Sequence, residues 1–195
     1  DLAKYKKLKL TGDLIFTNNG IRGPVVLDFA RELTPIIAKH NEVPLLISFL
    51  KGMNEEQIFT YIKKEIEKNP TATVLENLTT LLALSVATEI CNICEIDTSE
   101  KFKNIDGIKR EKLIKTLAWT PLTVTGHEGF KNAMITRGGV ELKEIDSKTM
   151  QSKLVSGLYF CGEVVNIDGP CGGYNLQWSF SSGYLAGKIA SLEAI

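Results

Sequence analysis

The chain has 195 residues, and its 23 basic and 23 acidic side chains give no net charge at pH 7. Hydrophobic residues make up 44% of it, enough to bury a core, which excludes a disordered or fibrous chain. Zero net charge argues against a nucleic-acid partner, because such proteins normally carry a basic excess. No apolar run reaches the roughly 18 residues of a membrane helix, and no signal peptide is recognisable. We therefore expect a cytoplasmic protein with no membrane partner.

Residues 1–50 show the pattern of short strands around one helix. Partial alternation of apolar and polar residues over 8–16 predicts a strand. Gly23-Pro24 predicts the start of a short helix, because proline suits the first helical position. Pro35 predicts the end of that helix, since an internal proline removes a hydrogen-bond donor and clashes with the preceding turn. The apolar run 45–49 predicts another strand.

Residues 51–117 have helical periodicity instead. Asn54 and Gln57 have the spacing of a capping box, with asparagine in place of the usual serine or threonine. A second helix is predicted over 74–93, and a third begins near Asp106. Basic and acidic side chains are nearly balanced across this zone, which indicates a mixed, solvated surface. The pattern predicts a small helical bundle.

Cys91 and Cys94 form a C-x-x-C pair, a spacing found in redox motifs and in halves of zinc sites. Cys91 falls within the predicted apolar helix over 74–93, and Cys94 falls at its end. The two histidines of the chain, His40 and His127, are distant in sequence. We therefore predict packed core thiols and no metal site.

The last part of the chain returns to strands. Three are predicted in the zone 118–150, over 120–125, 133–136 and 140–145. In the zone 151–195, the apolar run 157–163 predicts a buried strand and residues 174–190 predict a closing helix.

Glycine is concentrated in this terminal zone, with seven of the 16 glycines between Gly157 and Gly187. Glycines ahead of a helix let a ligand approach the free amides of its first turn. Glu163 falls at the end of the predicted strand, where open α/β sheets place ligand contacts. A tight turn joining a strand to a packed helix explains the same pattern, so both interpretations stay open. The chain contains neither G-x-G-x-x-G nor a P-loop motif.

Several motifs resemble one group of bacterial flavoproteins. The run Gly157-Leu-Tyr-Phe-Cys-Gly-Glu163, followed by Asp168-Gly-Pro-Cys-Gly-Gly-Tyr-Asn-Leu-Gln-Trp178, is similar to a motif of the NAD(P)/FAD-dependent oxidoreductases called aminoacetone-oxidase-like, which include bile-acid dehydro-reductases. Gly12–Thr17 with Gly20–Pro24, and Thr136–Val140, resemble further motifs of this family. The resemblance covers nearly the whole chain.

The resemblance implies an α+β architecture in four parts. A β-rich, barrel-like insert domain would comprise residues 1–50 and 118–150, and a small helical bundle over 51–117 would interrupt it. Residues 151–195 would supply the terminal strand and helix of a glutathione-reductase-like FAD domain.

The resemblance also implies the cofactors and their contacts. FAD would be the cofactor and NAD(P)H a co-substrate, with hydride passing to an unsaturated or carbonyl small molecule. Glu163 would bind the ribityl or pyrophosphate region of FAD. The complete set of expected cofactor-binding residues is Gly162, Glu163, Gly172, Gly173, Tyr174, Asn175 and Leu176.

No catalytic residue is identified by spacing. Tyr174, His127 and Glu163 are candidate proton donors, although a histidine in a glycine-flanked loop is more often a surface residue. Arg137 is a candidate contact for substrate or nicotinamide phosphate, and a plain surface arginine is the alternative.

The family pattern places a Rossmann fingerprint for ADP in an N-terminal half ahead of this sequence. We therefore expect the chain to be a C-terminal fragment that needs that half as its partner and is inactive alone. A different class of function remains open, in which FAD is structural or sensory and the helical insertion binds a partner.

Overall fold

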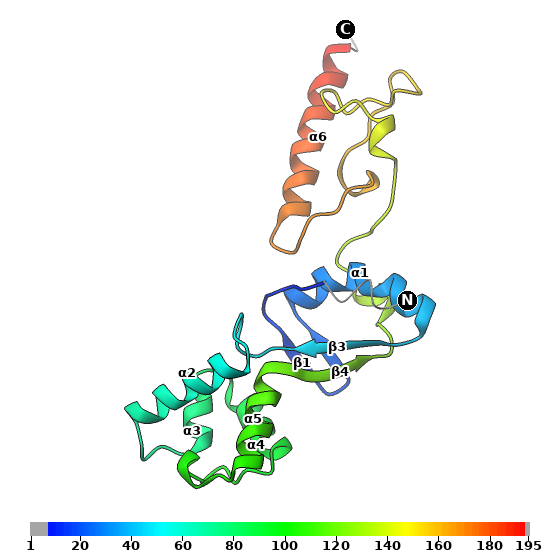
Figure 1. Cartoon of the computed structure of the whole chain (residues 1–195). Helices are drawn as coiled ribbons and strands as arrows, with labels where there is room; N and C mark the ends of the chain where they lie inside the picture. The colour runs from blue at the N-terminus through cyan, green and yellow to red at the C-terminus, as the bar shows by residue number, and fades with distance from the viewer. Residues whose placement is uncertain (1–7, 194–195) are drawn as a thin grey trace. The chain divides into compact units, whose positions relative to one another are not determined.

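A computed structural model describes residues 8–193 of the chain (Figure 1). It contains two compact units, one formed by residues 42–124 and the other by residues 8–41 with 125–193. The four-part domain division expected from the sequence remains a prediction, and residues 1–7 and 194–195 of its outer parts lie outside the described residues. In the described part of the chain, no helix has both the length and the apolarity needed to cross a membrane.

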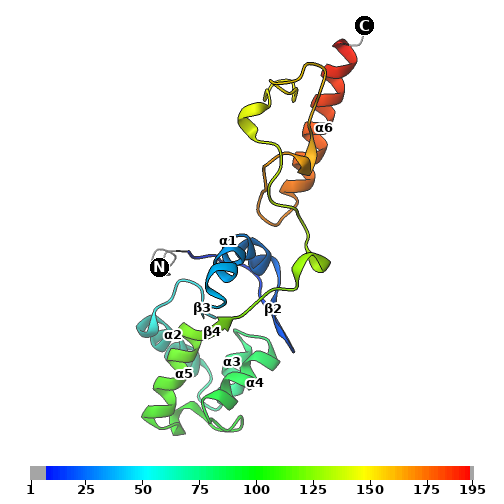
Figure 2. The same cartoon turned by 90° about the vertical axis from the view of Figure 1, so that its right-hand side faces the viewer.

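The unit 42–124 is a group of helices bracketed by two paired strands. Strand β3 (Val43–Ile47) pairs antiparallel with β4 (Thr120–Val124), so that Leu45 lies opposite Leu122. Between them the chain forms four α-helices, α2 (Glu55–Lys68), α3 (Val74–Thr79), α4 (Leu84–Ile93) and α5 (Gly107–Trp119), and one short 3-10 helix, η2 (Phe102–Asn104). Figure 2 shows these helices gathered on one side of the strand pair. The strands predicted over 45–49 and 120–125 are confirmed, the first shifted by two residues.

The helix starts follow the capping signals of the sequence. The Asn54 side chain accepts a hydrogen bond from the Gln57 amide, and the Gln57 side chain accepts one from the Asn54 amide, both at 2.9 Å. The predicted capping box is therefore confirmed, and Thr73 with Glu76 forms a second one at the start of α3. Asp106 caps α5 by accepting a hydrogen bond from the Lys109 amide.

The single helix predicted over 74–93 is wrong, because α3 ends at Thr79 and α4 begins at Leu84. The hydroxyl of Thr79 donates to the Glu76 carbonyl, and that of Thr80 donates to the Asn77 carbonyl. Such local side-chain bonds compete with the helical ladder. The chain then becomes extended at Ala83, which precedes α4.

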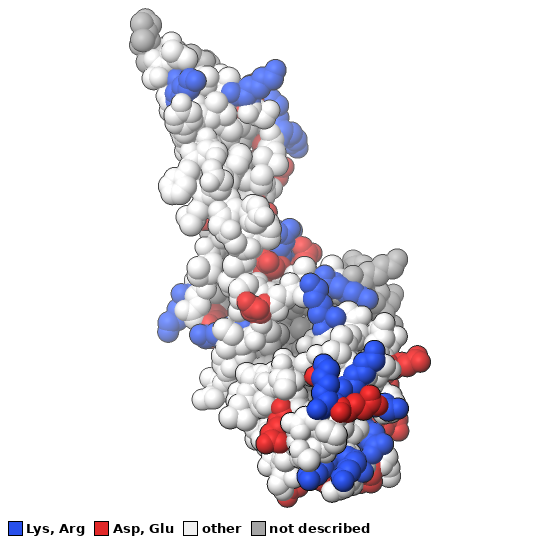
Figure 3. Space-filling model, turned by 90° about the vertical axis from the view of Figure 1, so that its left-hand side faces the viewer, with Lys and Arg blue, Asp and Glu red and all other residues white. Residues whose placement is uncertain are grey.

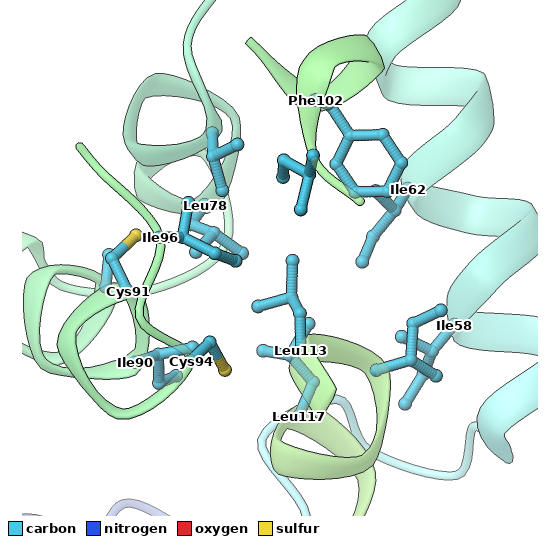
Figure 4. Packing of buried hydrophobic residues seen from close by; sticks show 14 of the residues in the cluster. Ile58, Ile62, Leu78, Ile90, Cys91, Cys94, Ile96, Phe102, Leu113 and Leu117 are labelled. Atoms are coloured by element: carbon cyan, nitrogen blue, oxygen red, sulfur yellow. The ribbon is translucent and has the colours of Figure 1, made fainter. Parts of the chain in front are cut away.

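The helices enclose a closed apolar core (Figure 4). Cys91 and Cys94 are fully buried in it, beside Ile90 and Ile96, so the prediction of packed core thiols is confirmed. Burial raises the pKa of both thiols, which keeps them protonated and unreactive near neutral pH. No three His, Cys, Asp or Glu side chains of the described residues form a group able to hold a metal ion.

The second unit begins with a short hairpin and a long helix. Strands β1 (Ile15–Thr17) and β2 (Gly20–Arg22) pair antiparallel, and α1 follows over Pro24–His40. The strand predicted over 8–16 is thus largely irregular and shifted toward its C-terminal end. The α1 helix ends at His40 and is capped by Asn41, which adopts the left-handed conformation.

The helix end predicted at Pro35 is wrong, because α1 continues past this residue for another five positions. A proline inside a helix leaves the carbonyl four residues earlier without its usual amide donor. Here that carbonyl belongs to Arg31, and it accepts a hydrogen bond of 2.7 Å from Nη1 of Arg137. A side chain from a distant part of the chain therefore replaces the missing donor.

The terminal part of this unit is irregular up to its last helix, α6 (Tyr174–Glu193). The strands predicted over 133–136, 140–145 and 157–163 are wrong, and only single bridges such as Val140 with Val165 form there. Glycines interrupt the extended backbone, since Gly139, Gly157 and Gly162 have φ of 146°, 78° and 69°. The expected terminal strand of an FAD domain is therefore absent from the described residues.

The barrel-like arrangement expected for the β-rich part is also not observed. The strands of the described residues form two separate two-stranded sheets, β1 with β2 and β3 with β4, and no barrel is closed. The protein is a mixture of helices and short strands, in which the last long helix, α6, packs on irregular chain.

Candidate functional site

The candidate site is the glycine-rich turn that precedes α6 and the short 3-10 helix η5 (Gly162–Val164) beside it. The indole Nε1 of Trp178 donates to the Gly162 carbonyl, and the Gly162 amide donates to Oγ of Ser182, both at 2.9 Å. Ser182 is buried, and its own hydroxyl donates back to the Trp178 carbonyl. Two side chains of α6 therefore fix the backbone immediately before Glu163.

Glu163 itself is exposed and makes no ion pair or hydrogen bond with the described residues. Its backbone is held against α6 through Gly162, while its carboxylate remains free to accept hydrogen bonds from a ligand.

The turn itself is locked by Asn175. The amide of Gly169 donates to Oδ1 of Asn175 at 2.8 Å, and Nδ2 of Asn175 donates to the Gly169 carbonyl at 3.0 Å. A Cβ at Gly169 would lie 2.9 Å from Cβ of Tyr174, so only glycine fits there. The Asn175 side chain is thus occupied in shaping the turn.

The last two glycines of the turn adopt backbone angles that favour glycine. Gly172 has φ of 132° and Gly173 has φ of 89°. A Cβ at Gly173 would meet nothing within 4 Å, so the backbone there borders open space. A ligand can approach this part of the main chain closely.

The first turn of α6 offers unpaired backbone donors. No acceptor among the described residues reaches the amides of Tyr174, Asn175 and Leu176. The N-terminus of a helix of this length carries partial positive charge. The arrangement can therefore bind an electron-rich group at the start of the helix.

The structure brings most of the expected site residues into one segment. Gly162 lies against the second and third turns of α6, and Gly172 to Leu176 form its entry. His127 is apart from them, in an exposed loop where its Nδ1 accepts a hydrogen bond from the Gly129 amide. Arg137 is half exposed, and its guanidinium contacts the carbonyl of Arg31 and the carboxylate of Asp168. The cofactor roles of the expected residues remain predictions.

Sequence reasoning did not single out Trp178, Ser182 or Asp168 as structural partners of this segment. All three lie in or next to the motif that carried the resemblance, which was a signal that could have found them. Trp178 and Ser182 contact Gly162 across 16 and 20 residues of sequence, and Asp168 contacts Arg31 across a longer separation. No local periodicity reveals such contacts.

Comparison with known proteins defines the class. Residues 12–189 match the model of the HI0933-like protein Rossmann domain. The chain therefore belongs to the HI0933-like family, which confirms the family resemblance drawn from its motifs.

Three curated relatives are similar over most of the chain. It is 32% identical over 181 residues to the 3-dehydro-bile acid delta(4,6)-reductase of Clostridium scindens, covering 93% of this chain and 44% of the relative. It is 35% identical to the ribosomal RNA dihydrouridine synthase of Haemophilus influenzae and 32% identical to that of Escherichia coli, in each case covering 88% of this chain and 40% of the relative. The chain thus spans less than half the length of these relatives.

Proposed function

We propose that this chain supplies the flavin-facing side of the FAD site in an oxidoreductase. The observation that carries the proposal is the open glycine turn at the start of α6, with unpaired amides at Tyr174, Asn175 and Leu176. The residues fit the group, because Gly173 borders open space and a helix N-terminus suits the electron-rich edge of an isoalloxazine ring. The free carboxylate of Glu163 suits the hydroxyls of a ribityl chain.

When bound, the flavin supplies two-electron chemistry between reduced nicotinamide and the substrate. The chain's own contribution is position and electrostatics. The α6 amides would hold the ring edge, and the partial positive charge of the helix would stabilise negative charge there. Gly173, which borders open space, would let the cofactor approach the backbone without side-chain obstruction.

The names of the relatives suggest the substrate class. A delta(4,6)-reductase and a dihydrouridine synthase both, by name, add hydrogen across a carbon–carbon double bond. We propose the same class of reaction here, with NAD(P)H as the source of hydride. The chain itself shows no basic excess for RNA binding, and we propose a small unsaturated molecule as the substrate.

One face of α6 indicates a protein partner. Leu176, Phe180 and Tyr184 recur at a spacing of four and are 66%, 71% and 73% exposed. Figure 3, which views the molecule from the side of α6, shows mainly uncharged surface over this helix. The opposite face of α6 is already packed, through Trp178 and Ala186. A helix that is apolar on both faces normally lies between two layers of protein.

We propose that the covering layer is the segment that carries the ADP-binding Rossmann fingerprint. The relatives are more than twice as long as the region that matches this chain, so they contain further segments that could fill this role. On this proposal the present chain alone does not form a complete FAD site.

A second candidate keeps the flavin but assigns it a structural or sensory role, with the helical unit binding a partner. A shallow hollow on that unit favours it, because Ile108 and Trp119 expose apolar surface there beside Lys112 and Lys115. Reduction of bound flavin distinguishes the two candidates.

The test uses the natural full-length protein that contains this sequence. It is purified, its flavin is identified by absorbance, and NADH or NADPH is added without oxygen. We expect the flavin band to bleach and to return when an α,β-unsaturated ketone is supplied.

Other outcomes would change the assignment. Return of the flavin band with a uridine-containing RNA alone would instead assign an RNA substrate. Flavin that binds but never bleaches would contradict the reductase and favour the second candidate, and absence of flavin would contradict both.

A further inference from the structure

A group of charged side chains beside the glycine turn has no place in the site described so far. Nη1 of Arg31 lies 3.1 Å from Oδ2 of Asp168, and Nε of Arg137 lies 3.8 Å from Oδ1 of the same carboxylate. The side chain of Asp168 is only 14% exposed, so these two arginines balance a largely buried charge. Asp168 immediately precedes Gly169, the first residue of the turn.

The backbone of α1 takes part in the same group. Pro35 leaves the Arg31 carbonyl without a helical donor, and Nη1 of Arg137 fills that position at 2.7 Å. Arg137 therefore joins α1 through the carbonyl of Arg31 and the turn through Asp168. The internal proline of α1 creates the acceptor that makes this junction possible.

A second contact ties α1 to the middle of the turn. The backbone amide of Cys171 donates to Oδ1 of Asp28 at 2.6 Å. Asp28 and Arg31 are three residues apart and so share one face of α1. That face holds the turn at two points, Asp168 and Cys171. We call Asp28, Arg31, Arg137 and Asp168 the α1 clamp.

The clamp is continuous with the first turn of α6. Asp168 is followed by Gly169, whose amide and carbonyl both bond to the side chain of Asn175. Any displacement of Asp168 would therefore be passed to Asn175 and to the amides on either side of it. The position of the α6 entry depends on side chains of α1 that lie more than 130 residues earlier in the chain.

The net charge of this group argues against a role in binding an anion. Two arginines stand among three carboxylates, because Glu32 also lies 3.5 Å from Nε of Arg31. With Asp28 and Asp168 the group carries a net charge of −1, which disfavours a phosphate or carboxylate ligand. The group is therefore suited to hold chain segments together rather than to bind an anion.

We propose that the α1 clamp positions the α6 amides for the flavin, with Asp28, Arg31, Arg137 and Asp168 acting as positioning residues. This rests on the proposed flavin site. The clamp fixes the turn before the cofactor arrives, so the amides need not be ordered at the moment of binding. Pre-organisation of this kind raises affinity without adding a contact to the ligand.

The test compares Asp168→Asn with Glu128→Gln in the natural full-length protein. Asparagine keeps the shape of Asp168 but removes its charge, whereas Glu128 forms an exposed ion pair with Arg22, and neither belongs to the clamp. We expect the Kd for FAD to rise about tenfold in Asp168→Asn, from the loss of a charged contact. In the flavin-free protein, amide hydrogen exchange over residues 169–176 should quicken about tenfold. Glu128→Gln should change neither quantity.

A second pair of variants keeps the proposal testable if Asp168→Asn does not fold. Asp28→Asn retains an oxygen that can accept from the Cys171 amide, and Asp28→Ala does not. We expect Asp28→Asn to restore most of the FAD affinity lost in Asp28→Ala. Where Asp168→Asn does fold, adding Arg31→Gln to it should weaken FAD binding no further, because both substitutions remove the ion pair between Arg31 and Asp168.

The possible outcomes distinguish a failure of the clamp proposal from a failure of the proposed flavin site. FAD that binds the wild type and Asp168→Asn equally would overturn the clamp and leave the proposed function standing, and faster exchange with unchanged affinity would also overturn it. A wild type that binds no FAD would overturn the proposed function, and with it any role of the clamp in positioning a flavin.

Discussion

The helical unit and the segment around α6 differ in how many of their apolar side chains are buried. In the helical unit, sixteen buried residues from the segment that connects β3 to β4 form one closed core. Around α6, four buried residues, Ile145, Met150, Val165 and Ala186, form the core, while large apolar side chains remain exposed along the helix. The helical unit buries many of its large apolar side chains in its own core. The exposed apolar side chains of α6, by contrast, would need a further layer of protein to cover them.

The largest contrast is expected between two leucines. Leu113→Ala empties a fully buried position of the helical core and should lower the free energy of unfolding by about 2–5 kcal/mol. Leu176→Ala removes a side chain that is 66% exposed and should change it by less than about 0.5 kcal/mol. Urea unfolding of the present chain measures both. Equal losses would contradict the contrast between a closed core and an uncovered helix.

Two glycines of the second unit should respond with opposite signs. A Cβ at Gly139 would lie 2.3 Å from the Val164 carbonyl oxygen, and φ there is 146°. Gly139→Ala should therefore destabilise by about 1–3 kcal/mol. Gly187 lies inside α6 with open space around its Cβ position, so Gly187→Ala should stabilise by about 0.5–1 kcal/mol. Thermal unfolding compares the two, and a stabilising Gly139→Ala would show that the Val164 contact is not close.

The capping box of α2 should contribute less to the free energy of unfolding than the buried leucine or the strained glycine. Asn54→Ala leaves the Gln57 amide without its acceptor and should cost about 1 kcal/mol. Asn54→Ser keeps a capping oxygen and should cost little. Denaturant midpoints of the two variants measure this difference, and an equal loss in both would argue that the cap does not stabilise the helical unit.

The cysteines distinguish the two regions by reactivity rather than by stability. Cys161 and Cys171 are exposed, whereas Cys91 and Cys94 are fully buried. A thiol reagent at pH 8 should label two thiols in the folded chain and all four in urea. Mass spectrometry identifies the labelled peptides, and rapid labelling of Cys91 would contradict the packed core.

The raised pKa of the two buried thiols also determines how their contribution to the free energy of unfolding changes with pH. In the unfolded chain these thiols ionise from about pH 8.5, while the folded protein keeps them protonated. Their contribution to stability is therefore complete below that pH and is lost as pH rises above it. Replacing both with alanine should flatten the decline between about pH 8.5 and 10 in unfolding experiments.

Local signals predicted local structure well. The capping pairs at Asn54 and Asp106 act within three residues, so the sequence alone locates the helix starts. The break after Thr79 was missed because threonine hydroxyls compete with the ladder inside a run that is otherwise apolar and helical.

Long-range partners explain the other errors. Pro35 was predicted to end α1, but Arg137, about a hundred residues later, satisfies the carbonyl that the proline exposes. Residues 157–163 were predicted to form a strand, but the carbonyl and amide of Gly162 instead bond to Trp178 and Ser182 of α6. The candidate site was located by its motif, and the contacts that hold it in place required the structure.

The central claim is that the segment before α6 binds FAD, and Glu163 tests it most directly. The measurement is the Kd for FAD of the full-length protein, by quenching of flavin fluorescence, for the wild type, Glu163→Gln and the control Glu128→Gln. We predict that Glu163→Gln weakens binding by at least about tenfold, because the amide loses the charge that strengthens hydrogen bonds from ligand hydroxyls. The control should bind as the wild type does. Equal affinity in all three proteins would contradict the assignment of Glu163 to the flavin site.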